Sequence, residues 1–155
     1  MKVQILVIFG GTGDLAMRKL LPALYQNHRE GALPDGMRIV GVGREGLERN
    51  SYLDKVRDVL RQFLPATDFD DAQWTTFSAR LEFVQLDARV SADYARLAAM
   101  LRWQDSRGHI FYLATPSELF IPICTELNRA ELVSAGRMPG RSPMVTILDA
   151  TAAKG

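Results

Sequence analysis

One stretch decides the fold of this chain: Val3-Gln4-Ile5-Leu6-Val7-Ile8-Phe9-Gly10-Gly11-Thr12-Gly13-Asp14-Leu15-Ala16. Its first seven residues are apolar except for one glutamine, which is the pattern of a parallel strand buried on both faces. Three glycines follow, and residues 14–25 then favour a helix. Glycine permits positive φ and lets backbone N–H groups approach a ligand closely, and those groups join the positive end of the helix dipole. The stretch therefore predicts an anion site, most often used for phosphate.

The glycine spacing by itself leaves alternatives open. It reads Gly10-x-x-Gly13-x-x-Ala16, whereas the commonest dinucleotide fingerprint is G-x-G-x-x-G. A glycine-rich hairpin between two antiparallel strands would carry the same triplet. A P-loop needs Gly-Lys followed by Ser or Thr, and Gly13-Asp14-Leu15 does not supply it. The buried strand before the glycines and the helix after them favour the dinucleotide-binding turn.

Length and composition fit one globular domain. The chain has 155 residues, of which 47% are apolar and 24% charged, so a core of ordinary size is available. The net charge of +1 predicts neither a basic face for nucleic acid nor an acidic tail. The apolar run 3–9 is too short to span a membrane, and it lacks a secretion cleavage site. The single cysteine, Cys124, excludes an internal disulfide, which agrees with a cytoplasmic location, and we expect it to be a small buried apolar residue.

Strand and helix patterns alternate along the chain. Pro22 predicts a kink or restart in the first helix, and Gly31 predicts its end. Ser51 is a candidate cap for a helix running to about Phe63. Further strands are expected over 38–43, 81–87, 109–114 and 144–148, further helices over 93–103 and 118–132, and a helical piece within 65–80. This alternation predicts an α/β fold, a single-domain, Rossmann-like, doubly wound parallel sheet with strand order 3-2-1-4-5.

The carboxyl ends of the strands form the predicted ligand crevice. Ligands bind such sheets where the strand order reverses, so we expect residues 10–15 and 114–116 to face each other. Asp87 and Ala88 leave the third strand at the same edge. Arg44 follows the second strand, where an arginine accommodates a 2′-phosphate and an acid binds the free 2′-hydroxyl. Arg44 therefore favours NADP over NAD, although the adjacent Glu45 could turn to the ribose.

Two other groups of polar residues are interpreted as structural. Asp68, Asp70 and Asp71 are expected to cap and solvate a helical piece, in preference to binding a metal. Oxidation of a hydroxyl group by a nicotinamide cofactor needs a general base, usually a histidine. His28 ends the first helix and His109 begins the fourth strand, which places both at the amino edge of the sheet, opposite the crevice. We therefore expect no catalytic residue and no metal site in this chain.

Residues 8–25 resemble the opening signature of glucose-6-phosphate dehydrogenase. They read Ile8-Phe9-Gly10-Gly11-Thr12-Gly13-Asp14-Leu15-Ala16-Met17-Arg18-Lys19-Leu20-Leu21-Pro22-Ala23-Leu24-Tyr25. Gly-Asp-Leu-Ala followed by basic residues and Leu-x-Pro is far more specific than the glycine spacing. Segments 39–44, 86–87 and 111–116 are also similar to the family and occur in the right order. The resemblance runs from about residue 3 to 132, so that we expect a dinucleotide-binding domain over 1–155 with an atypical segment at 133–155.

The resemblance implies an NADP-dependent oxidation of glucose 6-phosphate to 6-phosphogluconolactone, at the head of the pentose phosphate pathway. It implies that Arg44 holds the 2′-phosphate of NADP and that Lys19 lies near the sugar phosphate and the nicotinamide. Lys19 is equally interpretable as a solvated helix lysine. The other implied cofactor-binding residues are Gly10, Gly11, Thr12, Gly13, Asp14, Leu15, Ala16 and Met17 at the pyrophosphate, Asp87 and Ala88 beside the adenosine, and Ala114, Thr115 and Pro116 towards the nicotinamide.

The sequence departs from the family pattern towards its end. Ser117 replaces the second of two prolines, and residues 146–151 stand where the family has a Glu-Lys-Pro whose lysine serves the substrate site. The family's His-Tyr-Leu-Gly-Lys stretch, and the Asp that partners its histidine, do not occur in the 155 residues. We therefore expect NADP binding without turnover, the substrate domain being absent. Glucose 6-phosphate would be a partner only if that domain is supplied.

Other partners and functions follow from the same reading. Apolar surface that a substrate domain would cover is expected to favour self-association, and neither nucleic acid nor membrane is expected as a partner. A non-catalytic NADP-binding module or sensor is an alternative with the same crevice. A short Rossmann dehydrogenase would carry Tyr-x-x-x-Lys, and none of the four tyrosines is followed by a lysine four residues on.

Overall fold

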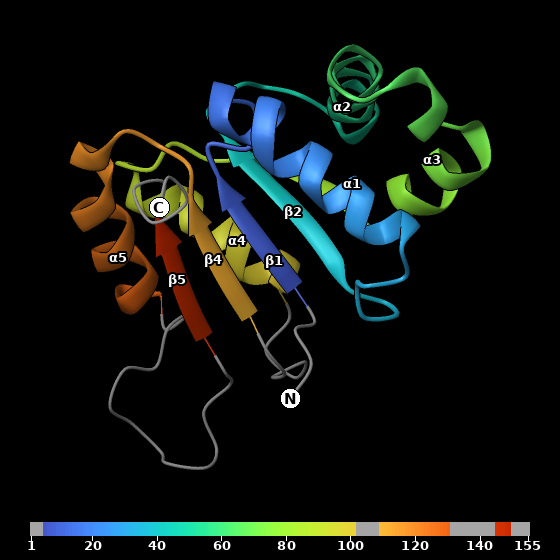
Figure 1. Ribbon diagram of the computed structural model, residues 1–155. Helices are drawn as coiled ribbons and strands as arrows, with labels where there is room; N and C mark the ends of the chain where they lie inside the picture. The colour runs from blue at the N-terminus through green and yellow to red at the C-terminus, as the bar shows by residue number, and fades with distance from the viewer. Residues whose placement is uncertain (1–4, 102–108, 131–144, 150–155) are drawn as a thin grey trace.

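The computed structural model describes residues 5–101, 109–130 and 145–149, the last of these by backbone alone. Its centre is a parallel sheet of five strands: β1 (Ile5–Phe9), β2 (Arg38–Gly43), β3 (Leu81–Gln85), β4 (His109–Leu113) and β5 (Val145–Asp149). The order across the sheet is β3-β2-β1-β4-β5, which confirms the predicted doubly wound topology (Figure 1). Because β1 pairs with both β2 and β4, the order reverses between β1 and β4.

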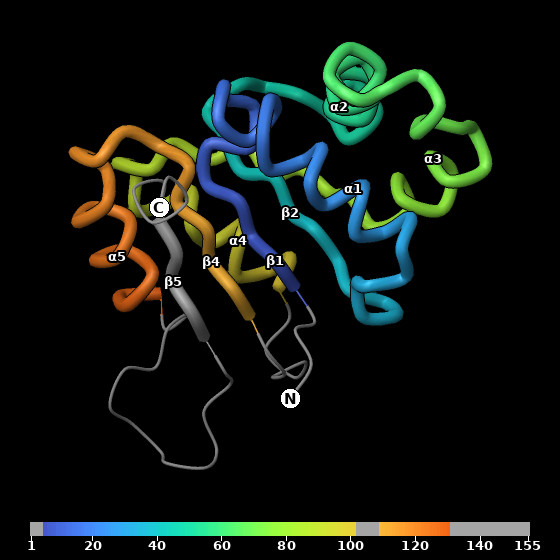
Figure 2. The backbone as a smooth tube through the Cα atoms, in the orientation of Figure 1, coloured from blue at the N-terminus to red at the C-terminus, as the bar shows by residue number. Residues whose placement is uncertain are grey.

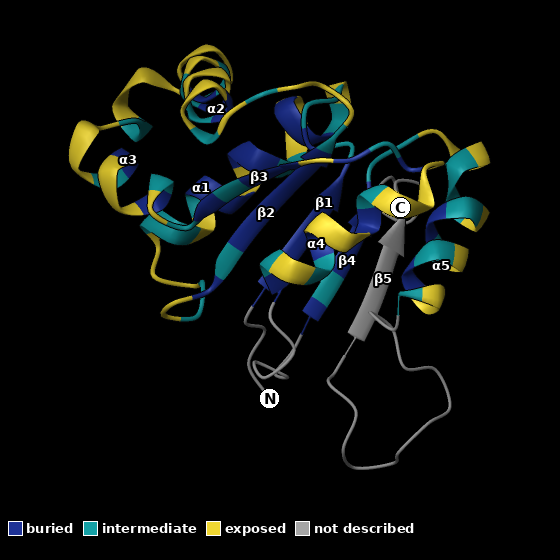
Figure 3. Ribbon diagram, turned by 180° about the vertical axis from the view of Figure 1, so that it is seen from behind, coloured by how far each residue is buried: buried dark blue, intermediate teal, exposed yellow. Residues whose placement is uncertain are grey.

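Helices cover both faces of the sheet, as Figure 1 shows. One face carries α1 (Leu21–Arg29), α2 (Arg49–Phe63) and α3 (Asp71–Ser78), and the other carries α4 (Tyr94–Leu101) and α5 (Phe120–Arg129). Strands β1 to β4 are buried along most of their length, whereas the outward sides of the helices are exposed (Figure 3). Within the described residues, no helix is long and apolar enough to cross a membrane.

The two-sided cover explains the composition of β1. Leu6 and Ile8 face the core beneath α1, α2 and α3, whereas Ile5, Val7 and Phe9 face the core beneath α4 and α5. All five residues of the strand are buried. A strand with a helix on each face needs no polar side, so its sequence is apolar without alternation.

The first helix restarts at Pro22, as its sequence predicted. A π-helical turn (Ala16–Leu20) comes first, in which the Leu21 N–H donates to the Ala16 carbonyl, and α1 then begins with the proline in its first turn. Proline has no amide hydrogen, so the ordinary ladder cannot pass through that position. The end of α1 also follows the prediction, because Gly31 has φ 72° and the Ala32 N–H closes back on the Asn27 carbonyl across 2.9 Å.

Three helix boundaries differ from expectation. Ser51 is not a cap, because α2 begins at Arg49, whose guanidinium donates to the carbonyls of Ser78 and Leu81 and thereby fixes the start of the helix. Helix α4 begins at Tyr94 after a 3₁₀ turn, and its predicted end at residue 103 lies outside the described residues. A further 3₁₀ turn (Ser117–Leu119) precedes α5, so this α-helix begins two residues later than predicted.

The acidic segment before β3 has a structural role. Asp70 caps α3 by accepting a hydrogen bond from the Gln73 N–H across 2.7 Å. Asp68 accepts from the Gln26 side chain across 2.8 Å and thereby joins its 3₁₀ turn to α1. Asp71 is exposed and lies 3.5 Å from the Arg57 guanidinium. The interpretation as capping and solvated residues is confirmed for Asp70 and Asp71, whereas Asp68 is partly buried and bonds to α1.

Candidate functional site

A cavity of about 420 Å³ lies at the carboxyl edge of the sheet, beside the point where the strand order reverses. The turns that follow β1, β2, β3 and β4 all reach this edge, as the backbone trace shows (Figure 2). The structure brings nine of the predicted cofactor-binding residues to its walls: Gly10, Thr12, Gly13, Arg44, Asp87, Ala88, Ala114, Thr115 and Pro116. Residues as far apart in sequence as 10 and 116 thus form one crevice, in the place that the doubly wound topology predicts.

The glycine turn needs glycine because it passes very close to neighbouring backbone. Gly10 has φ 81°, and a Cβ there would lie 2.6 Å from the Ala114 carbonyl oxygen. A Cβ on Gly11 would lie 2.8 Å from Cα of Gly41, in the middle of β2. A Cβ on Gly13 would lie 3.2 Å from the Gly10 carbonyl oxygen. The three glycines therefore let the turn lie between β2 and the segment that follows β4.

The amides of this turn divide into two sets. Those of Gly10 and Gly11 both donate to the Val42 carbonyl across 2.9 Å, and that of Gly13 donates to the Gly10 carbonyl. In the described part of the chain, the amides of Thr12, Asp14 and Leu15 have no backbone acceptor. Such N–H groups at the start of a helix are the donors that an anion uses. The glycines thus supply the space, and their neighbours supply the donors.

The remaining predicted residues do not line the cavity. Gly11 is buried against β2, and Ala16 and Met17 are buried on the core side of the π-helical turn. Leu15 is half-buried, and Asp14 is exposed with its carboxylate 3.2 Å from the Arg18 guanidinium. Lys19 is exposed to solvent on the π-helical turn. Side chains that follow the glycine turn point into the core or into solvent, so a contact of this segment with a ligand would have to come from its backbone.

The cavity has lining residues that the sequence reading missed. They are Phe9, Val42, Gly43, Leu86, Arg89, Glu118 and Leu119. Phe9, Val42, Gly43 and Leu86 lie at or next to the carboxyl ends of β1, β2 and β3, and this position is the signal that could have identified them. Arg89 is the most informative, because it adds a second arginine to the residues that line the crevice.

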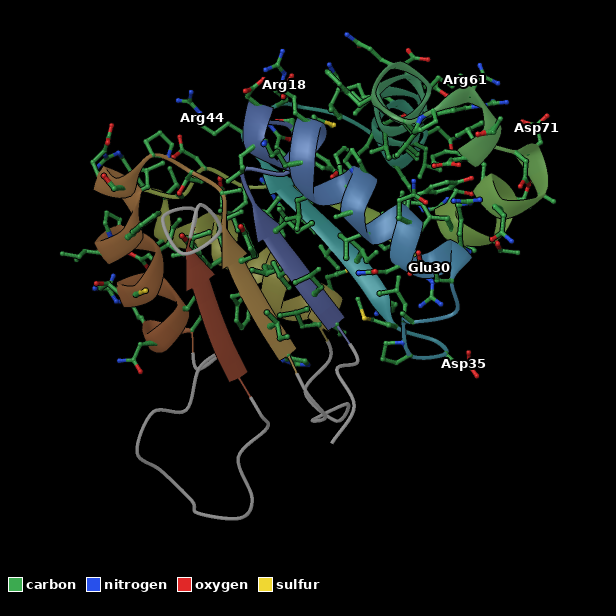
Figure 4. The ribbon with its side chains drawn as sticks, in the orientation of Figure 1. Arg18, Glu30, Asp35, Arg44, Arg61 and Asp71 are labelled. Atoms are coloured by element: carbon green, nitrogen blue, oxygen red, sulfur yellow. The ribbon has the colours of Figure 1, made fainter. Side chains whose placement is uncertain are left out.

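Charge is unevenly distributed around the crevice. Arg44 and Arg89 come from the turns after β2 and β3, and Figure 4 shows Arg44 extended outward at the carboxyl edge. The Asp87 carboxylate accepts from the Arg89 N–H across 3.0 Å, which keeps that turn folded back on itself. Glu118 lies on the opposite wall, after β4. A ligand with a phosphate near β2 and a less charged end near β4 would suit this distribution.

The walls of the crevice fit a dinucleotide on two structural grounds. The turn at Gly10 and Gly13 leaves room that a side chain would fill, directly beside the donors of Thr12 and Asp14. The Thr115 hydroxyl, on the β4 side, is buried and has no hydrogen-bond partner among the described residues. A buried hydroxyl without a partner is costly, and a polar group of a ligand in the crevice would satisfy it.

Neither histidine lines the crevice. His28 lies in the last turn of α1, beside Thr76 and Arg80, and His109 is the buried first residue of β4. Both positions are at the amino edge of the sheet, as predicted. Among the described residues, no cluster of His, Cys, Asp or Glu is arranged to hold a metal ion.

A sheet that reverses its order over a glycine turn, with an arginine after β2, defines a Rossmann-type domain that binds nicotinamide dinucleotides. The family model described as "Glucose-6-phosphate dehydrogenase, NAD binding domain" matches residues 7–142. The chain belongs to this family. NADP is the cofactor of glucose-6-phosphate dehydrogenase, in agreement with the prediction from the sequence.

Individual relatives agree with this assignment. Glucose-6-phosphate 1-dehydrogenase of Gluconobacter oxydans is 43% identical over 130 residues, which are 83% of this chain and 27% of that protein. The enzyme of the same name from Dickeya dadantii is 46% identical over 127 residues, 82% of this chain and 26% of that protein. The chain thus spans about a quarter of the length of these relatives.

Solved structures show the same likeness. The crystal structure of glucose-6-phosphate 1-dehydrogenase from Mycobacterium avium superposes with a TM-score of 0.79 at 29% identity, covering 94% of this chain and 29% of that one. A glucose-6-phosphate dehydrogenase in complex with its substrate, glucose 6-phosphate, gives a TM-score of 0.78 at 25% identity, covering 94% of this chain and 30% of that one.

Proposed function

We propose that this chain is the coenzyme-binding part of an NADP-dependent glucose-6-phosphate dehydrogenase and holds NADP in the crevice above β1, β2 and β4. The amides of Thr12, Asp14 and Leu15 would bind the pyrophosphate, and Arg44 would bind the 2′-phosphate. Asp87 and Ala88 would border the adenosine, and residues 114–116 the nicotinamide. The observation that carries this proposal is the position of Arg44, which follows β2 directly and lines the same cavity as the glycine turn.

Bound NADP would supply a hydride acceptor for oxidation of a sugar hydroxyl. The side chains described here contribute binding and orientation, and no histidine lies at the crevice to accept the hydroxyl proton. We therefore propose that the chain alone binds NADP without turnover. Oxidation of glucose 6-phosphate would need the residues that its longer relatives carry beyond the matched region.

The test is a calorimetric titration of the purified chain with NADPH and, in parallel, with NADH. We expect NADPH to bind at least about tenfold more tightly, a difference of roughly 1.4 kcal/mol, because NADH lacks the 2′-phosphate. Arg44→Ala should remove this preference. Arg61→Ala is the matched control, because Arg61 lies on α2, away from Arg44 and Arg18 (Figure 4), and should leave both affinities unchanged. Equal binding of the two cofactors by the unmodified chain would contradict the proposal.

We also propose a location and a mode of assembly. Cys124 is a half-buried free thiol on α5, and a thiol that is not in a disulfide suits a reducing compartment such as the cytoplasm. Ile121 on the same helix is 78% exposed, so an uncovered surface for self-association would include it. Sedimentation of the chain and of Ile121→Gln over a range of concentrations tests this. A monomer at every concentration would contradict self-association.

A further inference from the structure

Two buried tyrosines lie behind the walls of the crevice. Tyr52 in α2 is 0% exposed, and its hydroxyl donates to the Gly11 carbonyl across 3.0 Å. Tyr94 in α4 is 1% exposed, and its hydroxyl donates to the Ala88 carbonyl across 2.9 Å. Neither side chain lines the cavity, so any effect on a ligand must pass through the backbone that each one holds.

Packing fixes the position of Tyr52. Its ring lies directly against Gly41 in β2, where a Cβ would collide with the phenol. The ring also packs on Phe83 of β3, with ring centroids 4.9 Å apart. Burial raises the pKa of Tyr52 far above its ordinary value, so the hydroxyl stays protonated and acts as a donor at any physiological pH.

The hydroxyl acts on the peptide group between Gly11, which is buried, and Thr12, which lines the cavity. Gly11 is held at its N–H by the Val42 carbonyl and at its own carbonyl by Tyr52. The Gly11 carbonyl and the Thr12 N–H belong to the same planar peptide group and point in opposite directions. A bond that holds the carbonyl towards α2 therefore also sets the direction of the Thr12 N–H. Thr12 lines the cavity, and its amide has no backbone acceptor in the described part of the chain.

We propose that Tyr52 is a positioning residue for the pyrophosphate site, because its hydroxyl holds the Gly11–Thr12 peptide so that the Thr12 N–H faces the anion. This inference rests on the proposed function. Without the hydroxyl, the peptide can rotate and the buried Gly11 carbonyl loses its partner. The ligand then loses a preorganised donor, although every residue that lines the cavity is unchanged.

The test compares two ligands that share the adenosine 2′-phosphate, of which only one has the pyrophosphate and the nicotinamide ribose beyond it. NADPH carries all of these groups, whereas 2′-AMP carries only the first. In the full chain, Tyr52→Phe should raise the dissociation constant of NADPH about fivefold to tenfold, as expected for one lost hydrogen bond at the pyrophosphate. The dissociation constant of 2′-AMP should change less than about twofold. Tyr94→Phe is the matched control, since it removes an equally buried hydroxyl from the adenosine side, which both ligands use. It should leave the ratio of the two dissociation constants at its unmodified value.

The outcomes separate this inference from the proposed function. If the unmodified chain does not bind NADPH, the proposed function is wrong and the inference falls with it. If it binds NADPH but Tyr52→Phe leaves the ratio unchanged, whether by weakening both ligands equally or neither, only the inference is wrong. Thermal melting shows whether each variant folds. Should Tyr52→Phe not fold, 3-fluorotyrosine at position 52 keeps the ring and provides a stronger donor. It should tighten NADPH relative to 2′-AMP, and an unchanged ratio would overturn the inference.

Discussion

The Arg80 guanidinium donates from Nε to Nδ1 of His28 across 3.1 Å, and this bond determines which ring nitrogen of the histidine carries the proton. Arginine can only donate, so Nδ1 must accept and the hydrogen of the neutral ring is on Nε2. Nε2 lies 2.8 Å from Thr76 Oγ1 in α3. Arg80 also donates to the carbonyls of Pro34 and Met37. A neutral His28 thus completes a network that joins α1, α3 and the loop before β2 at the amino edge of the sheet.

Stability should fall in mild acid because of His28. Burial, and then the nearby charge of Arg80, lower the pKa of this ring below its ordinary value. The unfolded chain therefore binds the proton more readily. The contribution of neutral His28 to the free energy of unfolding is complete above the pKa of about 6.5 that the ring has in the unfolded chain. It is lost as the pH falls towards the lower pKa of the folded chain. Because the ring is only half-buried, we expect a loss below about 1 kcal/mol.

Urea unfolding between about pH 8 and pH 5 measures this effect. His28→Gln is the comparison variant, because glutamine can accept from Arg80 and donate to Thr76 without titrating in this range. Its stability should depend less on pH than that of the unmodified chain. Parallel pH profiles for the two chains would show that His28 does not carry the effect.

Gly10→Ala should be much more damaging than Gly36→Ala. Both glycines have positive φ, 81° and 76°, so each alanine costs about 1 kcal/mol for the backbone conformation alone. Only at Gly10 would the new Cβ also meet a carbonyl oxygen, that of Ala114, whereas Gly36 has open space around it. Thermal or urea unfolding should show that Gly10→Ala lowers the free energy of unfolding by at least about 2 kcal/mol more than Gly36→Ala does. Similar losses would mean that the turn moves away from β4 without difficulty.

Thr115→Val should separate stability from binding. Its hydroxyl is buried without a hydrogen-bond partner among the described residues, and valine has nearly the same shape. Removing an unpaired buried hydroxyl should leave the free chain as stable or up to about 1 kcal/mol more stable. NADPH binding should weaken about threefold to tenfold if the cofactor satisfies that hydroxyl. Thermal melting and a titration of the same preparation measure both. A less stable variant with unchanged affinity would refute this assignment.

Lys19→Ala should have little effect on the cofactor. Lys19 is exposed and does not line the cavity, so the dissociation constant of NADPH should change less than about twofold. Arg44→Ala, measured alongside, shows the size of a genuine cofactor contact. A large loss for Lys19→Ala would show that this lysine reaches the nicotinamide end of the crevice.

Several features could be read from the sequence because their causes are local. Pro22 lacks an amide hydrogen, so a restart of the first helix could be expected, although not that a π-helical turn would precede it. Gly31 ended α1 and Asp70 capped α3 through bonds to residues nearby in sequence. The prediction that Ser51 caps α2 was wrong because it rested on residue type alone. The start of α2 is held by Arg49, which bonds to carbonyls about 30 residues away.

The sequence by itself determined the strand order, the carboxyl-edge crevice and the cofactor family, because buried strands, glycine turns and helices each leave a short-range pattern. Only the tertiary structure decided which groups serve the crevice. In the folded chain the amides of Gly10 and Gly11 donate to the Val42 carbonyl and are not available to a ligand. Ala16 and Met17 are buried, and Arg89 lines the cavity. The tertiary structure also placed the Tyr52 hydroxyl on the Gly11 carbonyl, 41 residues away. Contacts of that range depend on how α2 packs across β2, and no local pattern in the sequence records them.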